Sequence, residues 1–253
     1  VPSISYMFIS LLGIALCSGS AAAINQVIDR SADASMNRTD KRPLPQGDIS
    51  PIHASIFALV IGFLGALILY IFVNTLTMYL TIASLIGYAF IYTVYLKRAT
   101  PQNIVIGGLA GAAPPLLGWT SITNSIDAYS LLLVLIIFIW TPPHFWALAI
   151  YRKDEYAKES IPMLPVTHGV AFTKLQIVLY TIILFLVSLL PYIVLMSGVI
   201  YLISALVLSS VFLYYSIKLY LGEGDEYAMK TFTYSIYYIF LIFIALLADH
   251  FIL

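Results

Sequence analysis

Two clusters of acidic and basic side chains stand beside long apolar runs in this sequence. In the first, Asn25, Asp29 and Asp33 recur every four residues, so a helix would place them on one face. Such oxygen ligands suit Mg²⁺, which binds one or two carboxylates and adds water and phosphate oxygens. Basic side chains follow at once, at Arg30, Arg38, Lys41 and Arg42. Acids that hold a cation beside bases that hold phosphate oxygens fit a metal–diphosphate site. The spacing is equally compatible with a solvated loop whose ion pairs are incidental.

The second cluster has the same mixed character. Arg152 and Lys153 are followed by Asp154 and Glu155, again directly after an apolar run. Either carboxylate could be the main metal ligand of this cluster, and we favour Glu155. If both clusters lie on one face of a membrane, they could converge on one diphosphate, each with a metal ion that neutralises the leaving group.

The elements that must position these clusters are membrane helices. Of the 253 residues, 61% are hydrophobic and 9% are charged, against about 25% charged in a soluble domain. That composition excludes a water-soluble globule. A net charge of zero excludes a basic nucleic-acid binder, and the single cysteine, Cys17, excludes a disulfide framework and a cysteine-based zinc site.

The uncharged runs predict an all-α, polytopic transmembrane bundle of eight helices. About 20 residues cross the hydrocarbon core, and continuous apolar character favours helices over alternating barrel strands. The predicted spans lie within residues 1–28, 54–96 (two helices that turn at Asn74 and Thr75), 103–119, 128–151, 175–217 (two helices that divide at Ser197 and Gly198) and 231–248. Pro142 and Pro143 predict a kink in the fifth helix. We expect one transmembrane domain over residues 1–253.

Charge assigns the loops to sides of the membrane. The eight predicted helices are joined by seven loops, numbered here in chain order. All 12 basic residues fall in the odd-numbered loops, which include the loop with Lys97 and Arg98. The positive-inside rule therefore predicts that the odd-numbered loops are cytoplasmic. Ten of the 12 acidic residues lie there too, and only Asp127 and Asp249 do not. Acids contribute little to the positive-inside rule, so their gathering requires another explanation.

Five segments carry a resemblance to a known family. They are NQVIDRSAD at 25–33, RTDKRPLP at 38–45, TPQNIVIGG running into GAAPPLLGW at 100–119, TPPHFW at 141–146 and IPMLP at 161–165. The sequence resembles the UbiA superfamily of intramembrane prenyltransferases. Within it, segments 100–119 and 141–146 resemble the branch that farnesylates protohaem IX.

The resemblance implies farnesyl diphosphate and haem B as substrates, Mg²⁺ as cofactor, and a multi-pass place in the plasma membrane with both clusters on the cytoplasmic side. It also implies nine helices, so we expect the family's first helix to be missing from this chain. Haem A synthase or a terminal oxidase would be possible assembly partners.

The resemblance assigns roles to the clustered residues. The catalytic residues would be Asp29, Asp33, Arg38, Arg42 and Glu155. The diphosphate would be bound by Asn25, Arg38, Lys41, Arg42, Lys97 and Arg98. The metal ligands would be Asn25, Asp29, Asp33, Asp154 and Glu155.

His144 is an ionisable residue inside an apolar span, where such residues are rare and usually functional. Neutral imidazole binds iron, so His144 is a candidate haem-binding residue. The alternative is a histidine that hydrogen-bonds a carbonyl freed by the neighbouring prolines.

Two rival functions remain open from the sequence. A secondary transporter would place ionisable groups near the bilayer midplane, whereas here they crowd one face. Prenylation of an aromatic quinone or chlorin precursor is the second rival.

Overall fold

The computed structural model describes residues 2–36 and 39–252, and every regular element in these residues is helical. Eight stretches are long and apolar enough to cross a membrane, which confirms the predicted number. They are Ile4–Ser35, Pro51–Phe72, Thr75–Ala99, Asn103–Thr123, Ala128–Tyr151, Val170–Ile193, Val199–Leu221 and Glu226–Ile252.

The chain divides into two compact units, each described by itself. Unit 1 comprises Val1–Ala99 and Leu109–Ser130, and unit 2 comprises Thr100–Gly108 and Leu131–Leu253. The expectation of one domain over residues 1–253 therefore stays a prediction. The two predicted acidic clusters fall in different units, so their convergence stays a prediction as well.

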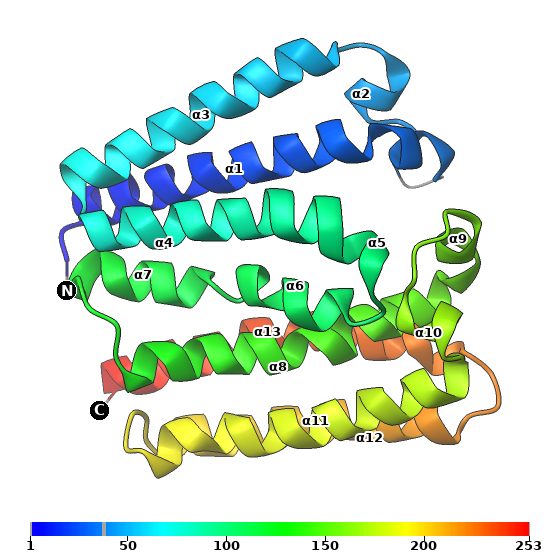
Figure 1. The fold of residues 1–253 in the computed structure, drawn as a ribbon. Coiled ribbons are helices and arrows are strands. Elements are labelled where there is room, and N and C mark those ends of the chain that lie inside the picture. The colour runs from blue at the N-terminus through cyan, green and yellow to red at the C-terminus, as the bar shows by residue number, and fades with distance from the viewer. Residues whose placement is uncertain (1, 37–38, 253) are drawn as a thin grey trace. The chain divides into compact units, whose positions relative to one another are not determined.

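In unit 1, α1 (Ile4–Ser35) packs along α3 (Pro51–Phe72), and both contact α4 (Thr75–Ile86) (Figure 1). Small residues allow the close approach of α1 and α3. A Cβ on Gly13 would lie 2.7 Å from Leu69, and one on Gly65 would lie 2.7 Å from the Gly13 carbonyl oxygen. In a bilayer the hydrophobic effect does not drive helices together. Close van der Waals packing, which small residues allow, stabilises their association instead.

Two interruptions in the helices of this region were not predicted. After α4 the backbone continues as a π-helix, η1 (Gly87–Leu96), which ends at the short helix α5 (Lys97–Ala99). The predicted span 103–119 consists of two helices, α6 (Asn103–Gly111) and α7 (Pro114–Thr123). The span itself is confirmed, and it divides before Pro114 because Pro114 and Pro115 have no N–H to donate to the preceding turn.

Other predicted boundaries are confirmed. Asn74 caps α4, since its side chain accepts a hydrogen bond from the Thr77 amide at 2.8 Å. The chain also leaves helix between Ile193 and Val199, around the predicted division at Ser197 and Gly198. The helix α8 (Ala128–Tyr151) runs through Pro142 and Pro143 without ending, and the predicted kink stays a prediction.

Unit 2 is built around α8, α11 (Val170–Ile193), α12 (Val199–Leu221) and α13 (Glu226–Ile252) (Figure 1). Its core joins buried side chains from all four helices: Leu132, Ile136, Leu184, Val187, Tyr201, Ala205, Phe212, Tyr238, Ile242 and Ala245. Two short helices, α9 (Lys153–Lys158) and α10 (Leu164–Thr167), connect α8 to α11. In unit 1 the short helix α2 (Pro43–Gln46) follows the first acidic cluster.

Charged side chains from neighbouring helices close both ends of α12. At its N-terminus the buried Asp249 carboxylate accepts hydrogen bonds from the amides of Gly198 and Tyr201. At its C-terminus the Lys174 ammonium donates to the carbonyl oxygens of Gly222 and Gly224, at 3.0 and 2.8 Å. Both charges have the sign that the helix dipole favours, so they satisfy terminal backbone groups and hold α11 and α13 against α12.

Candidate active site

The first predicted cluster lies at the polar end of α1, where the helix continues past the apolar run as far as Ser35. Asn25 is half-buried, while Asp29 and Asp33 are 3% and 5% exposed. Carboxylates are almost never buried to this degree without partners, so their surroundings decide what they can do.

The Asp29 carboxylate has one satisfied oxygen and one bare oxygen. Its Oδ2 accepts hydrogen bonds from Lys97 Nζ at 2.6 Å and from Asn25 Nδ2 at 3.0 Å. Its Oδ1 is buried and accepts no hydrogen bond from any residue that the structure describes. A buried carboxylate oxygen without a donor carries a large desolvation cost, and a cation or a water bound to one would remove it.

Asn25 is held in place by a residue that the sequence did not single out. The same amide nitrogen also donates to Thr93 Oγ1 at 3.0 Å, and Thr93 in turn donates to the Tyr88 carbonyl oxygen, five residues back in η1. Thr93 lies four residues before Lys97, but no pattern in the sequence links it to Asn25. The π-helix therefore contributes to the site, in keeping with where such segments occur.

Asp33 forms the second ion pair of this cluster. Its Oδ2 accepts a hydrogen bond from the Arg42 guanidinium at 2.6 Å, and its backbone carbonyl accepts one from the Thr39 hydroxyl at 3.0 Å. Arg42 stands immediately before α2, so the loop that follows α1 folds back onto it. Unit 1 thus brings together Asn25, Asp29, Asp33, Arg42 and Lys97.

The remaining predicted residues of unit 1 lie further out. Lys41 and Arg98 are exposed, and Arg38 lies outside the described residues. Exposed bases next to the buried pairs are free to meet an anion that approaches from solvent.

In unit 2 the second predicted cluster forms the helix α9. Asp154 is exposed, while Glu155 is partly buried and pairs with Arg152 at 3.2 Å. The Arg152 Nε is buried and has no hydrogen-bond partner in the described part of the chain. Within those residues, no three His, Cys, Asp or Glu side chains come close enough to form a complete metal site. Such a set is not required for Mg²⁺, which takes few protein ligands when a substrate supplies phosphate oxygens.

His144 is 8% exposed in unit 2 and lies on α8. Its Nδ1 forms a 2.6 Å hydrogen bond with the Ser235 hydroxyl of α13. Its ring stacks on Trp140, with centroids 4.2 Å apart. Within the described residues, the hydrogen-bond partner of this histidine is the Ser235 hydroxyl and not a carbonyl oxygen freed by the prolines.

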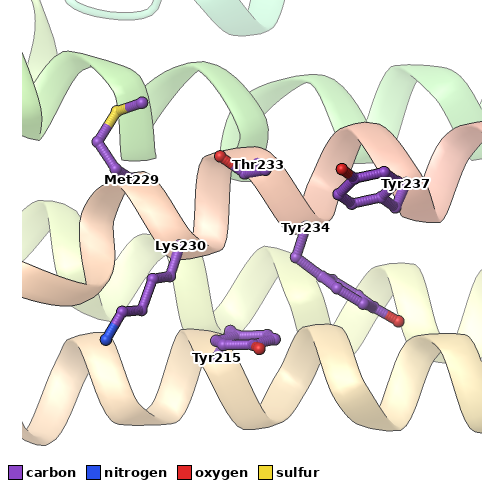
Figure 2. A pocket seen from close by; sticks show the side chains of 6 residues that line it. All are labelled: Tyr215, Met229, Lys230, Thr233, Tyr234 and Tyr237. Atoms are coloured by element: carbon purple, nitrogen blue, oxygen red, sulfur yellow. The ribbon is translucent and has the colours of Figure 1, made fainter.

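A depression of about 330 Å³ lies elsewhere, over α12 and α13, and is lined by Tyr215, Met229, Lys230, Thr233, Tyr234 and Tyr237 (Figure 2). Among the described residues that line it, only Lys230 is charged, and it is paired with Glu226 at 3.3 Å. The loop before α13 adds the exposed acids Glu223 and Asp225. This surface is therefore not suited to a diphosphate, and none of the predicted site residues lies in it.

The UbiA prenyltransferase family model matches residues 1–247. The chain is 64% identical over 242 residues to Protoheme IX farnesyltransferase 1 of Pseudomonas fluorescens (strain Pf0-1), covering 96% of this chain and 81% of that one.

Solved structures share the fold. A digeranylgeranylglyceryl phosphate synthase has a TM-score of 0.82 at 18% identity, covering 100% of this chain and 88% of that chain. A UbiA homologue of Archaeoglobus fulgidus bound to GPP and Mg²⁺ has a TM-score of 0.64 at 16% identity, covering 96% and 88%. A family model that spans almost the whole chain, together with relatives of this identity, is decisive: the protein belongs to the UbiA prenyltransferase family.

Proposed function

We propose that this protein transfers a farnesyl group from farnesyl diphosphate to a vinyl group of protohaem IX, with Mg²⁺ bound at the first acidic cluster. The observation that carries the proposal is the buried, half-satisfied Asp29 carboxylate between Asn25 and Lys97. The substrate pair is supported by the 64% identity to a protohaem IX farnesyltransferase. Mg²⁺ is supported by the homologue bound to GPP and Mg²⁺.

The residues present fit a divalent metal. Asp29 Oδ1 is a hard oxygen without a donor, and Asn25 and Asp33 supply further oxygens on the same helix. Asp154 and Glu155 of α9 would add the second carboxylate set. When bound, Mg²⁺ neutralises the negative charge that builds on the departing diphosphate.

In this proposal the basic side chains change partners when the substrate binds. Without substrate, Lys97 and Arg42 neutralise Asp29 and Asp33, as the 2.6 Å pairs indicate. With the metal–diphosphate bound, both bases turn to phosphate oxygens, joined by Arg38, Lys41 and Arg98. They then stabilise the leaving group as its charge grows, which is the kind of interaction that raises the rate and not merely the affinity.

The organic step follows from the charge that the diphosphate leaves behind. Loss of diphosphate breaks the C1–O bond of the farnesyl group and leaves an allylic cation. The π electrons of a haem vinyl group form the new C–C bond, and the cation transferred to the adjacent carbon takes up water and loses a proton. Haem B, farnesyl diphosphate and water thus become hydroxyethylfarnesyl haem and diphosphate. Apolar surroundings protect the first cation from premature capture by water.

We place the reaction at the cytoplasmic face of the plasma membrane. The support is the segregation of all 12 basic residues to the odd-numbered loops, which contain or adjoin both clusters.

The deciding experiment gives the detergent-solubilised protein haem B, farnesyl diphosphate and Mg²⁺, and analyses the haem by mass spectrometry. We expect a product heavier by one farnesyl group and one hydroxyl group, because the added water loses a proton. Asp29→Asn and Asp33→Asn should each abolish it, and so should EDTA, with activity restored by added Mg²⁺. Failure of the wild-type protein to farnesylate haem would reject the proposal, and full activity in EDTA would reject its metal.

A further inference from the structure

The ring of His144 is fixed in one plane by aromatic neighbours. Trp140 and Phe232 stack on it, with centroid distances of 4.2 and 4.6 Å and interplanar angles of 20° and 26°. Phe145 meets it edge-on at 4.8 Å. The imidazole therefore has little freedom to rotate, and its hydrogen bonds decide which nitrogen carries the proton.

The Ser235 hydroxyl has one proton and two close neighbours. Its Oγ lies 2.5 Å from the Phe232 carbonyl oxygen and 2.6 Å from His144 Nδ1. A carbonyl oxygen can only accept a hydrogen bond, so the hydroxyl must donate to it, since two oxygens at that distance without a proton between them would repel. Oγ then accepts from His144, whose Nδ1 must carry a proton.

When the ring carries a single proton, this arrangement leaves Nε2 with a lone pair. Nε2 forms no hydrogen bond with the residues that the structure describes. The arrangement is rigid because the Trp140 indole donates to the Ser235 carbonyl oxygen at 2.8 Å, which ties α8 to α13 at this level. Histidines that bind metals usually donate their other ring N–H to an acceptor that fixes tautomer and orientation.

We propose that Ser235 is a positioning residue whose hydroxyl holds His144 as the Nδ1–H tautomer and so presents the Nε2 lone pair to the iron of the haem substrate. This inference rests on the proposed function and extends it to the way the macrocycle is held. Ser235 acts through His144 and does not touch the reacting atoms.

The first test needs no substrate. The protein is labelled with ¹⁵N-histidine in detergent, and the His144 signals are assigned by their loss in His144→Asn. The ¹⁵N shifts should show a protonated Nδ1 and an unprotonated Nε2 in the wild type and in Ser235→Thr, which keeps the hydroxyl. Ser235→Ala should lose this tautomer preference. A wild-type His144 protonated at Nε2 would overturn the proposal, whatever the enzyme does.

The second test uses ferrous haem B bound to the purified protein. Resonance Raman spectroscopy should show an iron–imidazole stretch that disappears in His144→Asn and shifts in Ser235→Ala. In Ser235→Ala, we expect kcat to fall about 10- to 100-fold with the KM for farnesyl diphosphate unchanged, and Ser235→Thr should recover most of the loss.

The outcomes separate the two proposals. If the wild type forms farnesylated haem while Ser235→Ala keeps the wild-type iron–imidazole stretch and kcat, the positioning role is wrong and the function stands. If no farnesylated haem forms although the His144 tautomer is as expected, the proposed function fails on its own.

Discussion

At the scale of single residues, the pairing of Asp29 with Lys97 has a stability consequence that can be separated from activity. The Asp29 side chain is 4% exposed, so Lys97→Met leaves a buried carboxylate without its counterion. We expect this change to cost about 3 kcal/mol of unfolding free energy. Adding Asp29→Asn removes the stranded charge, so the double variant should regain most of the stability and none of the activity.

Thermal unfolding in detergent, with haem farnesylation measured on the same samples, checks this prediction. Arg98→Met is the matched control for stability, because Arg98 is an exposed neighbour on the same short helix. Additive losses of stability from Lys97→Met and Asp29→Asn would mean that the two side chains are not coupled.

The residues of this site differ in how visible they are in the sequence. The four-residue spacing of Asn25, Asp29 and Asp33 predicts a shared helical face, and α1 provides it. Thr93 was missed because its role comes from a contact across 68 positions of the chain, between two helices. Ser235 was missed for the same reason, since only the packing of α13 on α8 brings it to His144. Local patterns carry no information about such pairs.

At the scale of helices, the two acids that the charge pattern left on the far side of the membrane both cap helices. Asp127 accepts from the Ser130 amide at 2.8 Å, at the start of α8. Asp249 accepts from two amides at the start of α12, one on each carboxylate oxygen. Carboxylates at helix N-termini satisfy orphan donors and complement the helix dipole, which explains why these acids lie apart from the others.

Asp127 accepts from one amide and Asp249 from two, so the same substitution should have unequal effects on stability at the two positions. Asn keeps one side-chain oxygen, so Asp127→Asn should leave stability nearly unchanged, since Asn is an equally good cap. Asp249→Asn should cost about 1–3 kcal/mol, because one buried amide loses its acceptor. Melting temperatures in detergent give the answer, with the exposed Asp48→Asn as a control. Equal effects at positions 127 and 249 would contradict the capping account.

The extent of the helices could be predicted from the sequence, but only one of their two interruptions could. Long apolar runs determine the eight spans because the bilayer admits few other structures. The break before Pro114 could have been derived from the proline pair alone. The π-helix η1 (Gly87–Leu96), which contacts α1, has no comparable signal in the sequence, since its residues continue the apolar run without proline.

At the scale of the whole molecule, the distribution of charge makes a topology prediction that does not depend on catalysis. All 12 basic residues belong to the odd-numbered loops or the helix ends beside them, and the positive-inside rule places these in the cytoplasm. Cys17 is the single cysteine and is buried, so Cys17→Ser gives a background for single-cysteine labelling. Exposed positions are available in loops of both kinds: Asp48 and Glu223 in odd-numbered loops, and Ser125 in an even-numbered one.

The labelling uses cells whose plasma membrane is intact and whose cell wall or outer membrane has been removed. In such cells, a membrane-impermeant maleimide should label Ser125→Cys. It should label Asp48→Cys and Glu223→Cys only after the membrane is made permeable. Asp48 and Glu223 follow the first and seventh spans, so agreement between them requires an even number of crossings from one loop to the other. Opposite labelling of these two positions would contradict the eight-span count itself. The reverse of the expected pattern would keep the count and move both acid–base clusters to the outer face, away from the cytoplasmic side where we place the reaction.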